Sequence, residues 1–408
     1  MLTQSVEMGS KKRTLTAIFI ILFLDTFGYA LLFPSLFLNS KIAILPIDTK
    51  ETTFHILLSI MLMAYPLTQF FGATFFGNIS DHYGRKKILS VTILGTIIGD
   101  ICSALSLYAQ SYTLLLLSQL FTGFFAANLG ICMAVFADIF GTKKARGKAF
   151  CFVAAILGFS WMISFFLVVL FNSPKFNYHP ATPFWCFALF SLISLIIFLP
   201  LVKETAPTYA CTRQKLLARD HLRMLYLIIF FWSLGLFISF QWLSPISFIK
   251  FKVTENEILL LFLSIGTFWI LSALLLGYWM VSRFSLWKVS LWMLFFISLF
   301  LFFAGTSDYF SYFIITYSLS MIFAALVWGI VLALTSMAAK AGEQGRVMGL
   351  IQSMFALSKL LAPFIGGIIV GISLNPLLYC CAFLIFVAFI LLLINVIRRS
   401  NRDLLIQH

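Results

Sequence analysis

The sequence predicts an all-α polytopic membrane protein with twelve transmembrane helices arranged as two six-helix bundles. Of its 408 residues, 62% are hydrophobic and only 10% are charged, whereas charged residues make up about 25% of a typical soluble protein. The apolar residues form runs of roughly 20, and a helix of that length crosses about 30 Å of hydrocarbon. Backbone polar groups in hydrocarbon must be paired internally, so helices are the expected form, and the short alternating segments of a β-barrel are not seen in the sequence.

The apolar runs place the expected spans along the chain, with short polar stretches between them. They cover residues 14–38, 54–76, 88–108, 112–136, 149–171, 183–202, 224–247, 257–281, 288–305, 310–335, 347–371 and 376–397. The basic N-terminal stretch and the length of the first run predict an uncleaved first span rather than a signal peptide. The seven cysteines lie mostly within apolar runs, which indicates small hydrophobic residues and no disulfide framework.

The basic residues predict the orientation of the spans. The formal net charge is +14, which in a soluble domain would suggest nucleic acid binding, but here the bases occupy short loops between apolar runs. If the N-terminus is cytoplasmic, that side carries about 22 of the 28 lysines and arginines. The positive-inside rule therefore predicts that both termini are cytoplasmic.

A polar loop halfway along the chain predicts the division into two bundles. The stretch 203–223, "KETAPTYACTRQKLLARDHLR", follows six spans and precedes six more. We therefore expect an N-terminal bundle over 1–202, a cytoplasmic central loop over 203–223 and a C-terminal bundle over 224–408. A faint repeat supports the division, because a glycine and a basic character recur between 77–87 and 277–288, and repeated six-helix units are common in transporters.

The loop between the second and third spans has the most specific pattern in the chain, G-x-x-x-D-x-x-G-R-K-K over residues 77–87. Gly77 would let two helices approach closely, and Gly84 can adopt a positive φ in a tight turn. Asp81 and Arg85 are four residues apart, so they can pair on one helical face. A loop that only sets topology would explain the bases but not the whole pattern.

This pattern resembles the signature loop of the major facilitator superfamily, which lies there between spans 2 and 3. The resemblance covers the whole chain and is strongest to the twelve-span drug:proton antiporters, especially the tetracycline efflux group. It implies the major facilitator fold, two bundles that alternately open to each side of the membrane. Four further stretches support it: "LDTFGYALLFPSLF" (24–37), "GTIIGDICSAL" (95–105), "ADIFGTKKARGKAF" (137–150) and "EQGRVMGLIQS" (343–353).

In that family, the arginine of the loop and the aspartate that ends span 4 form a charge relay that closes the cytoplasmic side. Carried over to this sequence, the resemblance implies a pair of Arg85 with Asp138, beside Asp81. The implied cytoplasmic gate consists of Gly77, Asp81, Gly84, Arg85, Lys86, Asp138 and Arg146.

Three departures from the antiporter pattern leave the direction of transport and the coupling ion open. Gln119 stands in span 4 where the antiporters usually carry an arginine linked to proton coupling. Span 5 has Gly158 but lacks the Gly-Pro signature of the antiporters. Span 9 lacks the aspartate of the tetracycline exporters.

Three ionisable residues, Asp25, Asp100 and Lys359, fall inside expected spans. Each buried charge costs at least about 2.5–3.5 kcal/mol at the centre of a span. A carboxylate withdrawn from water can load and release a proton, so Asp25 and Asp100 are candidates for proton coupling. Structural pairs between helices are the alternative. Lys359 would either attract an anionic substrate or neutralise Asp25 or Asp100.

Polar and aromatic residues in the spans supply candidates for substrate contact. The resemblance implies that spans 1, 4, 7 and 10 line the cavity. The candidates are Tyr29, Gln119, Asn128, Gln241, Trp328 and Lys359. Simple hydrogen bonds between helices are the alternative for each of the polar ones.

The motifs that the sequence lacks exclude several other functions. The stretch "GTKKARGKA" (141–149) has the wrong glycine spacing for a phosphate-binding loop, which argues against ATP-driven transport by this chain. No H-E-x-x-H or G-x-S-x-G is present, so we expect neither an enzyme nor a cofactor or metal site. A membrane sensor without transport is a further alternative.

The main hypothesis is a secondary active transporter, expected as a monomer in a bacterial inner membrane. It would export drug-like compounds in exchange for protons. The alternative is proton-coupled uptake, or exchange, of an anionic metabolite or a carboxylate siderophore. The expected partners are the lipid bilayer, a small-molecule substrate and protons, with no nucleic acid.

Overall fold

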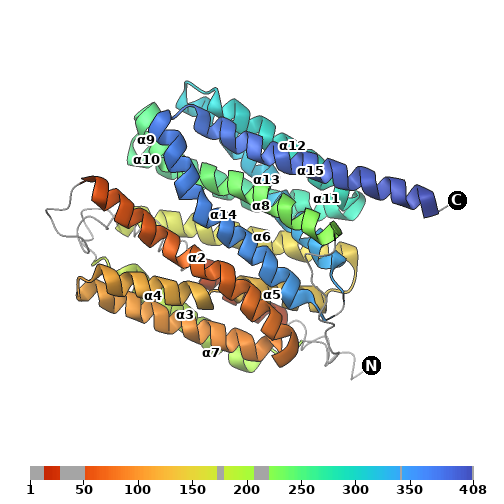
Figure 1. Cartoon of the computed structure of the whole chain (residues 1–408), viewed down its shortest axis with the longest axis horizontal. Coiled ribbons are helices and arrows are strands. Elements are labelled where there is room, and N and C mark those ends of the chain that lie inside the picture. The colour runs from red at the N-terminus through yellow and green to blue at the C-terminus, as the bar shows by residue number, and fades with distance from the viewer. Residues whose placement is uncertain (1–12, 28–50, 172–178, 206–219, 341, 407–408) are drawn as a thin grey trace. The chain divides into compact units, whose positions relative to one another are not determined.

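The computed structural model describes residues 13–27, 51–171, 179–205, 220–340 and 342–406. All regular secondary structure in these ranges is helical, so the all-α prediction is confirmed (Figure 1). Eleven helices in the described residues are long and apolar enough to cross a membrane. The first expected span, 14–38, begins in the helix at residues 13–27, and the rest of it lies outside the described residues.

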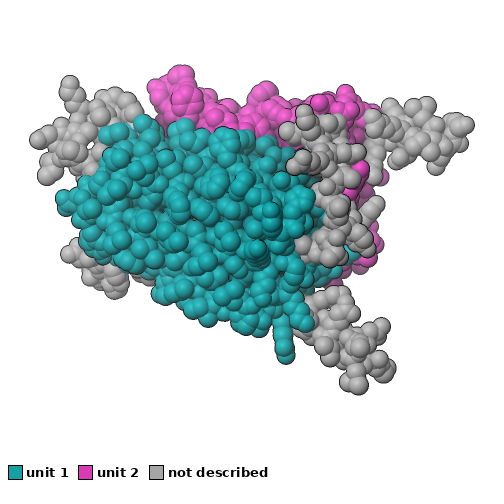
Figure 2. Space-filling model, turned by 60° about the horizontal axis from the view of Figure 1, so that its bottom comes forward, with its two compact units in different colours: residues 1–141, 156–211, 341–356 teal, residues 142–155, 212–340, 357–408 magenta. Residues whose placement is uncertain are grey.

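The chain forms two compact units, coloured separately in Figure 2. Unit 1 contains residues 1–141, 156–211 and 341–356. Its complete helices are the one at 13–27, α2 (Glu51–Tyr83), α3 (Arg85–Tyr108), α4 (Tyr112–Phe125), α5 (Asn128–Ile139) and α7 (Thr182–Leu201).

Unit 2 contains residues 142–155, 212–340 and 357–408. Its complete helices are α8 (Asp220–Gln241), α9 (Leu243–Phe251), α10 (Glu255–Leu271), the π-helical turn η3 (Ser272–Gly277), α11 (Tyr278–Arg283), α12 (Leu286–Gly305), α13 (Phe310–Ala338) and α15 (Pro376–Ile406). The first four residues of α8 lie in the expected central loop 203–223, and there the Asp220 carboxylate accepts a hydrogen bond from Arg223 (2.8 Å).

Two long helices contribute residues to both units. Helix α6 (Lys143–Phe171) belongs to unit 2 up to residue 155 and to unit 1 afterwards. Helix α14 (Gln344–Ile372) belongs to unit 1 up to residue 356 and to unit 2 afterwards. The division of the sequence into bundles at 1–202 and 224–408 stays a prediction.

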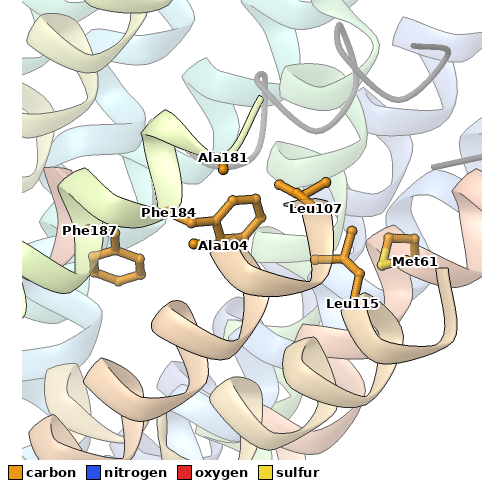
Figure 3. Close-up of a cluster of buried hydrophobic side chains, with 7 residues drawn as sticks. All are labelled: Met61, Ala104, Leu107, Leu115, Ala181, Phe184 and Phe187. Atoms are coloured by element: carbon orange, nitrogen blue, oxygen red, sulfur yellow. The ribbon is translucent and has the colours of Figure 1, made fainter. Parts of the chain in front are cut away.

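A cluster of apolar side chains packs one end of the helices in unit 1 (Figure 3). Its buried members come from α2, α3, α4 and α7 and the residue before α7: Met61, Ala104, Leu107, Leu115, Ala181, Phe184 and Phe187. The two phenylalanines are 1% exposed, and burying such a side chain contributes about 1.5–3 kcal/mol when the alternative is water. The cluster holds α7 against α3 and fixes the frame that carries the polar residues described next.

Candidate functional site

A buried ion cluster joins α2 to α3 and α5 in unit 1. The guanidinium of Arg85, 1% exposed, contacts the Asp81 carboxylate at 2.6 Å and the Asp138 carboxylate at 3.0 Å. It also donates to the Ser80 hydroxyl at 2.7 Å. Gly84 separates α2 from α3 with a φ of +100°, as its position in the pattern predicted. The pairs of Arg85 with Asp81 and with Asp138 are thus both present, and the gating role that the resemblance gives them is a proposal.

Asp81 also holds the beginning of α14. Its two carboxylate oxygens accept hydrogen bonds from the backbone N–H groups of Gly345 and Arg346, each at 2.8 Å. These N–H groups lie in the first turn of the helix, where they have no partner within the helix and the helix dipole favours a negative charge. One carboxylate therefore binds both the guanidinium of Arg85 and the end of a helix more than 260 residues away along the chain.

Glycines let α2 and the first half of α14 pack backbone against backbone. A Cβ atom added at Gly349 would meet the carbonyl oxygen of Ala73 and the Cα of Gly77, and one added at Gly77 would meet the backbone of Gly345. The close approach expected of Gly77 is confirmed, and its partner is α14. This packing brings the N-terminus of α14 within reach of Asp81.

Replacing Gly349 by alanine is expected to force α2 and α14 apart and to destabilise the protein by about 1–3 kcal/mol. Gly371→Ala is the matched control on the same helix, because a Cβ atom there meets nothing within 4 Å. Alanine favours a helix over glycine, so the control should be neutral or slightly stabilising. Thermal denaturation of the purified protein in detergent measures both variants. Equal denaturation temperatures for the two would contradict the packing argument.

Glu204 is a functional-site residue that the sequence analysis missed. It follows α7, and its carboxylate accepts hydrogen bonds from the backbone N–H groups of Arg85 (2.7 Å) and Lys86 (3.1 Å) at the beginning of α3. A Cβ atom at Gly84 would collide with this carboxylate. The side chain of Lys86 donates to the carbonyl oxygen of Leu199 at 2.7 Å, which also ties α3 to α7.

Arg146, expected as a further gate residue, lies in unit 2. Its guanidinium donates to the backbone carbonyl and the hydroxyl of Ser336, each at 3.3 Å, and so connects the beginning of α6 with the end of α13. Its membership of a gate with Arg85 stays a prediction.

The expected span 112–136 is interrupted between α4 and α5, at Ala126 and Ala127. The carbonyl oxygen of Ala126 leaves the helical pattern and accepts hydrogen bonds from the side-chain amides of Gln69 (2.9 Å) and Gln352 (2.7 Å). The Gln352 side-chain oxygen accepts from the N–H of Gly130 (2.6 Å). Irregular backbone at membrane depth needs such partners, and interrupted helices often mark binding sites in transporters.

Asn128, the first residue of α5, connects this interruption to Asp25. Its side-chain amide donates to the Asp25 carboxylate at 2.7 Å, and its own Oδ1 has no hydrogen-bond partner in the described part of the chain. Ser160 and Ser164 on α6 donate to the carbonyl oxygens of Phe23 and Phe27, which hold the helix at 13–27 on either side of Asp25.

Asp100 is a fully buried carboxylate of the candidate site. It is 0% exposed, and neither of its oxygens has a hydrogen-bond partner among the residues that the structure describes. Gly99, the residue before Asp100, lets α3 pack closely on α4 at Thr122. An ionised Asp100 would therefore be a buried, uncompensated charge, which is strongly unfavourable.

Other expected substrate residues in unit 1 are placed differently. Gln119 is 3% exposed and donates to the Ser103 hydroxyl at 3.0 Å, and Ser103 in turn donates to Ser118 at 2.8 Å. This network joins α3 to α4. It agrees with the alternative given for Gln119 in the sequence analysis, a simple hydrogen bond between helices. Tyr29 lies outside the described residues.

In unit 2 the candidate Gln241 lies at a second interruption, where α8 ends at Gln241 and α9 begins at Leu243. The Gln241 Oε1 and the Trp242 Nε1 are buried and have no hydrogen-bond partner in the described ranges. The indole of Trp242 packs on α14, where a Cβ atom at Gly366 would collide with it.

Lys359 and Trp328 also lie in unit 2. The Nζ of Lys359 lies 5.5 Å from the ring centroid of Phe237, within the range of a cation–π interaction. Trp328, on α13, is 7% exposed. Whether Lys359 attracts a substrate or neutralises a carboxylate stays a prediction.

The fold, the apolar spans and the buried ion cluster define a multi-pass α-helical membrane protein. The chain belongs to the Major Facilitator Superfamily, because the model of that family matches residues 15–309. Members of this family are transporters rather than enzymes, and they act on small-molecule substrates in a membrane.

Comparisons with individual proteins support this assignment. The chain is 25% identical over 195 residues to the class H tetracycline resistance protein of Pasteurella multocida, a match that covers 47% of this chain and 45% of that protein. The chain spans about half the length, or less, of the curated relatives it matches.

Solved structures match nearly the whole chain. The human organic anion transporter MFSD10 (TETRAN) gives a TM-score of 0.76 at 19% identity, over 93% of this chain and 99% of that one. The proton:xylose symporter XylE gives 0.77 at 14% identity, over 92% and 94%. At these identities the likeness shows the fold alone.

Proposed function

We propose that this transporter is a proton-coupled exporter of drug-like compounds. The observation that carries the proposal is the pair of carboxylates in unit 1. Asp100 is buried without a hydrogen-bond partner among the described residues, and Asp25 is held by Asn128 beside the interrupted helix. The similarity to a tetracycline resistance protein favours export and a drug-like substrate.

In this proposal Asp25 and Asp100 load protons from one side of the membrane and release them to the other. A protonated carboxyl is neutral and tolerates burial, whereas the anion needs water or a donor such as the Asn128 amide. The protonated and the ionised form of each carboxyl therefore favour different surroundings. Alternating access would supply this change of surroundings. Polar groups at the two helix interruptions, Asn128 and Gln241, are the proposed substrate contacts.

The Arg85 cluster would act as the cytoplasmic gate. Opening would break the hydrogen bonds from Gly345 and Arg346 to Asp81, and closing would re-form them. In this scheme the chain is a monomer in a bacterial inner membrane. Both termini are cytoplasmic, and the two six-helix bundles are joined by the loop at 203–223.

A second candidate function is proton-coupled uptake or exchange of an anionic metabolite or a carboxylate siderophore. Lys359 favours it, because a cation over the ring of Phe237 inside a span can attract an anionic substrate. The glutamine at position 119, in place of an arginine, favours it too.

Replacing Asp25 by asparagine is expected to abolish substrate-driven proton flux, because the amide keeps the shape of the side chain but cannot carry a proton. Proteoliposomes with a pH-sensitive dye inside, loaded with a panel of drugs and small carboxylates, measure this flux. Asp308→Asn, at an exposed carboxylate, is the matched control and should behave as the wild type.

The direction of the flux decides between the two functions. Proton movement opposite to a drug, lost in Asp25→Asn and kept in the control, supports export. Movement in the same direction as a carboxylate, and sensitive to Lys359→Met, would establish uptake and refute the export proposal.

A further inference from the structure

A cavity of about 670 Å³ lies within unit 2, and no residue of the proposed transport mechanism lines it. It opens where α8 and α12 begin and where α13 and α15 end. Successive spans run in opposite directions, so these four helix ends lie at the same face of the membrane. The cavity is therefore at the level of the lipid headgroups, at the face that we expect to be cytoplasmic.

The polar part of its wall is suited to an anion. Lys144 and Arg398 are exposed bases on the wall. Asn395 also lines the cavity, is 7% exposed, and has no hydrogen-bond partner for its Nδ2 in the described part of the chain. The Nδ1 of His221 lies 3.3 Å from the Asn395 Oδ1, which fixes the amide so that its N–H groups remain available as donors.

Among the described residues of the wall, the one carboxylate is that of Asp220, and it does not oppose an anion strongly. Asp220 is exposed, and the guanidinium of Arg223 donates to it at 2.8 Å. A ligand in the cavity would therefore meet two bases, an amide donor that is not in use, and one carboxylate that is already paired.

Apart from His221 and Ser285, the rest of the wall is apolar. It includes Met224, Leu286, Trp287, Leu334 and Met337. A soluble phosphate compound would have no use for such a wall, whereas an acyl chain would. Tryptophan at this depth is typical of the membrane–water boundary, and basic pockets between helices on the cytoplasmic side bind acidic lipid headgroups.

We propose that this cavity is a binding site for an acidic phospholipid. The phosphate-bearing headgroup lies between Lys144, Arg398 and the Asn395 amide, and the first part of an acyl chain lies against the apolar wall. The site shares no residue with the Asp25 and Asp100 carboxylates or with the Arg85 cluster.

Native mass spectrometry of the full chain in detergent tests the proposal, with phosphatidylglycerol or phosphatidylcholine added. We expect preferential binding of phosphatidylglycerol. Each base near a lipid headgroup is worth about 1 kcal/mol, or about fivefold in affinity, so Lys144→Gln with Arg398→Gln should weaken binding roughly 25-fold. The matched control is Arg283→Gln with Lys288→Gln, which removes two exposed bases that do not line the cavity and should keep the binding.

A second variant distinguishes a cavity from general attraction to a basic surface. Ala338→Phe places a phenyl ring in the cavity without changing any charge and should also weaken binding, while thermal denaturation shows that the variant is folded. An equal loss of lipid binding in the Lys144→Gln, Arg398→Gln variant and in the Arg283→Gln, Lys288→Gln control would overturn the proposal. Unchanged binding in Ala338→Phe would overturn it too. Displacement of the lipid by glycerol phosphate at comparable concentration would assign the site to a soluble phosphate compound instead.

Discussion

Replacing Arg85 by alanine should abolish transport and destabilise the protein by about 3–5 kcal/mol, the cost of breaking a buried ion pair from one side. The guanidinium is 1% exposed and contacts two carboxylates and a hydroxyl. Without it, the Asp81 and Asp138 carboxylates stay buried, with side chains 0% and 9% exposed, and lose their shared counter-ion. Asp81 also holds the beginning of α14, so the damage extends to the contact between α2 and α14.

Two comparisons make the Arg85 prediction specific. Lys87→Ala removes a neighbouring exposed base, whose Nζ lies 5.9 Å from the ring centroid of Tyr83, and should change the stability by less than about 1 kcal/mol. Arg85→Lys keeps the charge but cannot reproduce the planar fork that reaches both carboxylates, so it should be intermediate. Thermal denaturation in detergent and transport in proteoliposomes measure all three variants.

A double variant tests whether the uncompensated carboxylates of Asp81 and Asp138 cause the loss of stability in Arg85→Ala. Adding Asp138→Asn to Arg85→Ala removes one of the two uncompensated carboxylates and should recover part of the lost stability. If the two changes are simply additive, or if Arg85→Ala is as stable as Lys87→Ala, the ion cluster does not hold α2, α3 and α5 together.

The parts of the fold and of the site that the sequence could predict depend on local patterns. Hydropathy and length locate the helices, because hydrocarbon allows so few alternatives. The contact of Arg85 with Asp81 follows from a spacing of four residues, and the turn at Gly84 from the freedom of glycine. The contact of Arg85 with Asp138 came from the resemblance to a family.

What the sequence could not predict are hydrogen bonds between a side chain and a distant backbone. Glu204 is 119 residues from Arg85, and Gln352 is 226 residues from Ala126. A backbone group is the same at every residue, so no residue pattern indicates which one a side chain will bind. The interruption between α4 and α5 was hidden for a related reason, since the residues around it are apolar and their hydropathy is that of a continuous span.

Replacing Asp100 by asparagine should separate proton coupling from substrate movement. The carboxylate is fully buried and without a hydrogen-bond partner in the described residues, so its neutral form is the one that the surroundings tolerate. Asparagine has nearly the same shape and is always neutral. The variant should therefore fold, and it should still exchange substrate across the membrane when both sides contain it.

Transport against a gradient should nevertheless be lost in Asp100→Asn, by at least tenfold, because the proton carried at this position is missing. Thr96→Val is the matched control on the same helix. Thr96 is 1% exposed, and among the described residues its hydroxyl bonds only locally, to the carbonyl oxygen of Ile93 at 2.8 Å, so its removal should leave coupling intact. Proteoliposomes with an imposed proton gradient measure accumulation, and the same vesicles without a gradient measure exchange.

The pair of measurements on Asp100 also distinguishes a coupling role from a structural one. A structural carboxyl would affect accumulation and exchange alike, because both need the folded helices. Loss of accumulation with exchange retained is expected only if Asp100 moves protons. Accumulation equal to that of Thr96→Val would remove Asp100 from the mechanism and leave Asp25, with its partner Asn128, to carry the coupling alone.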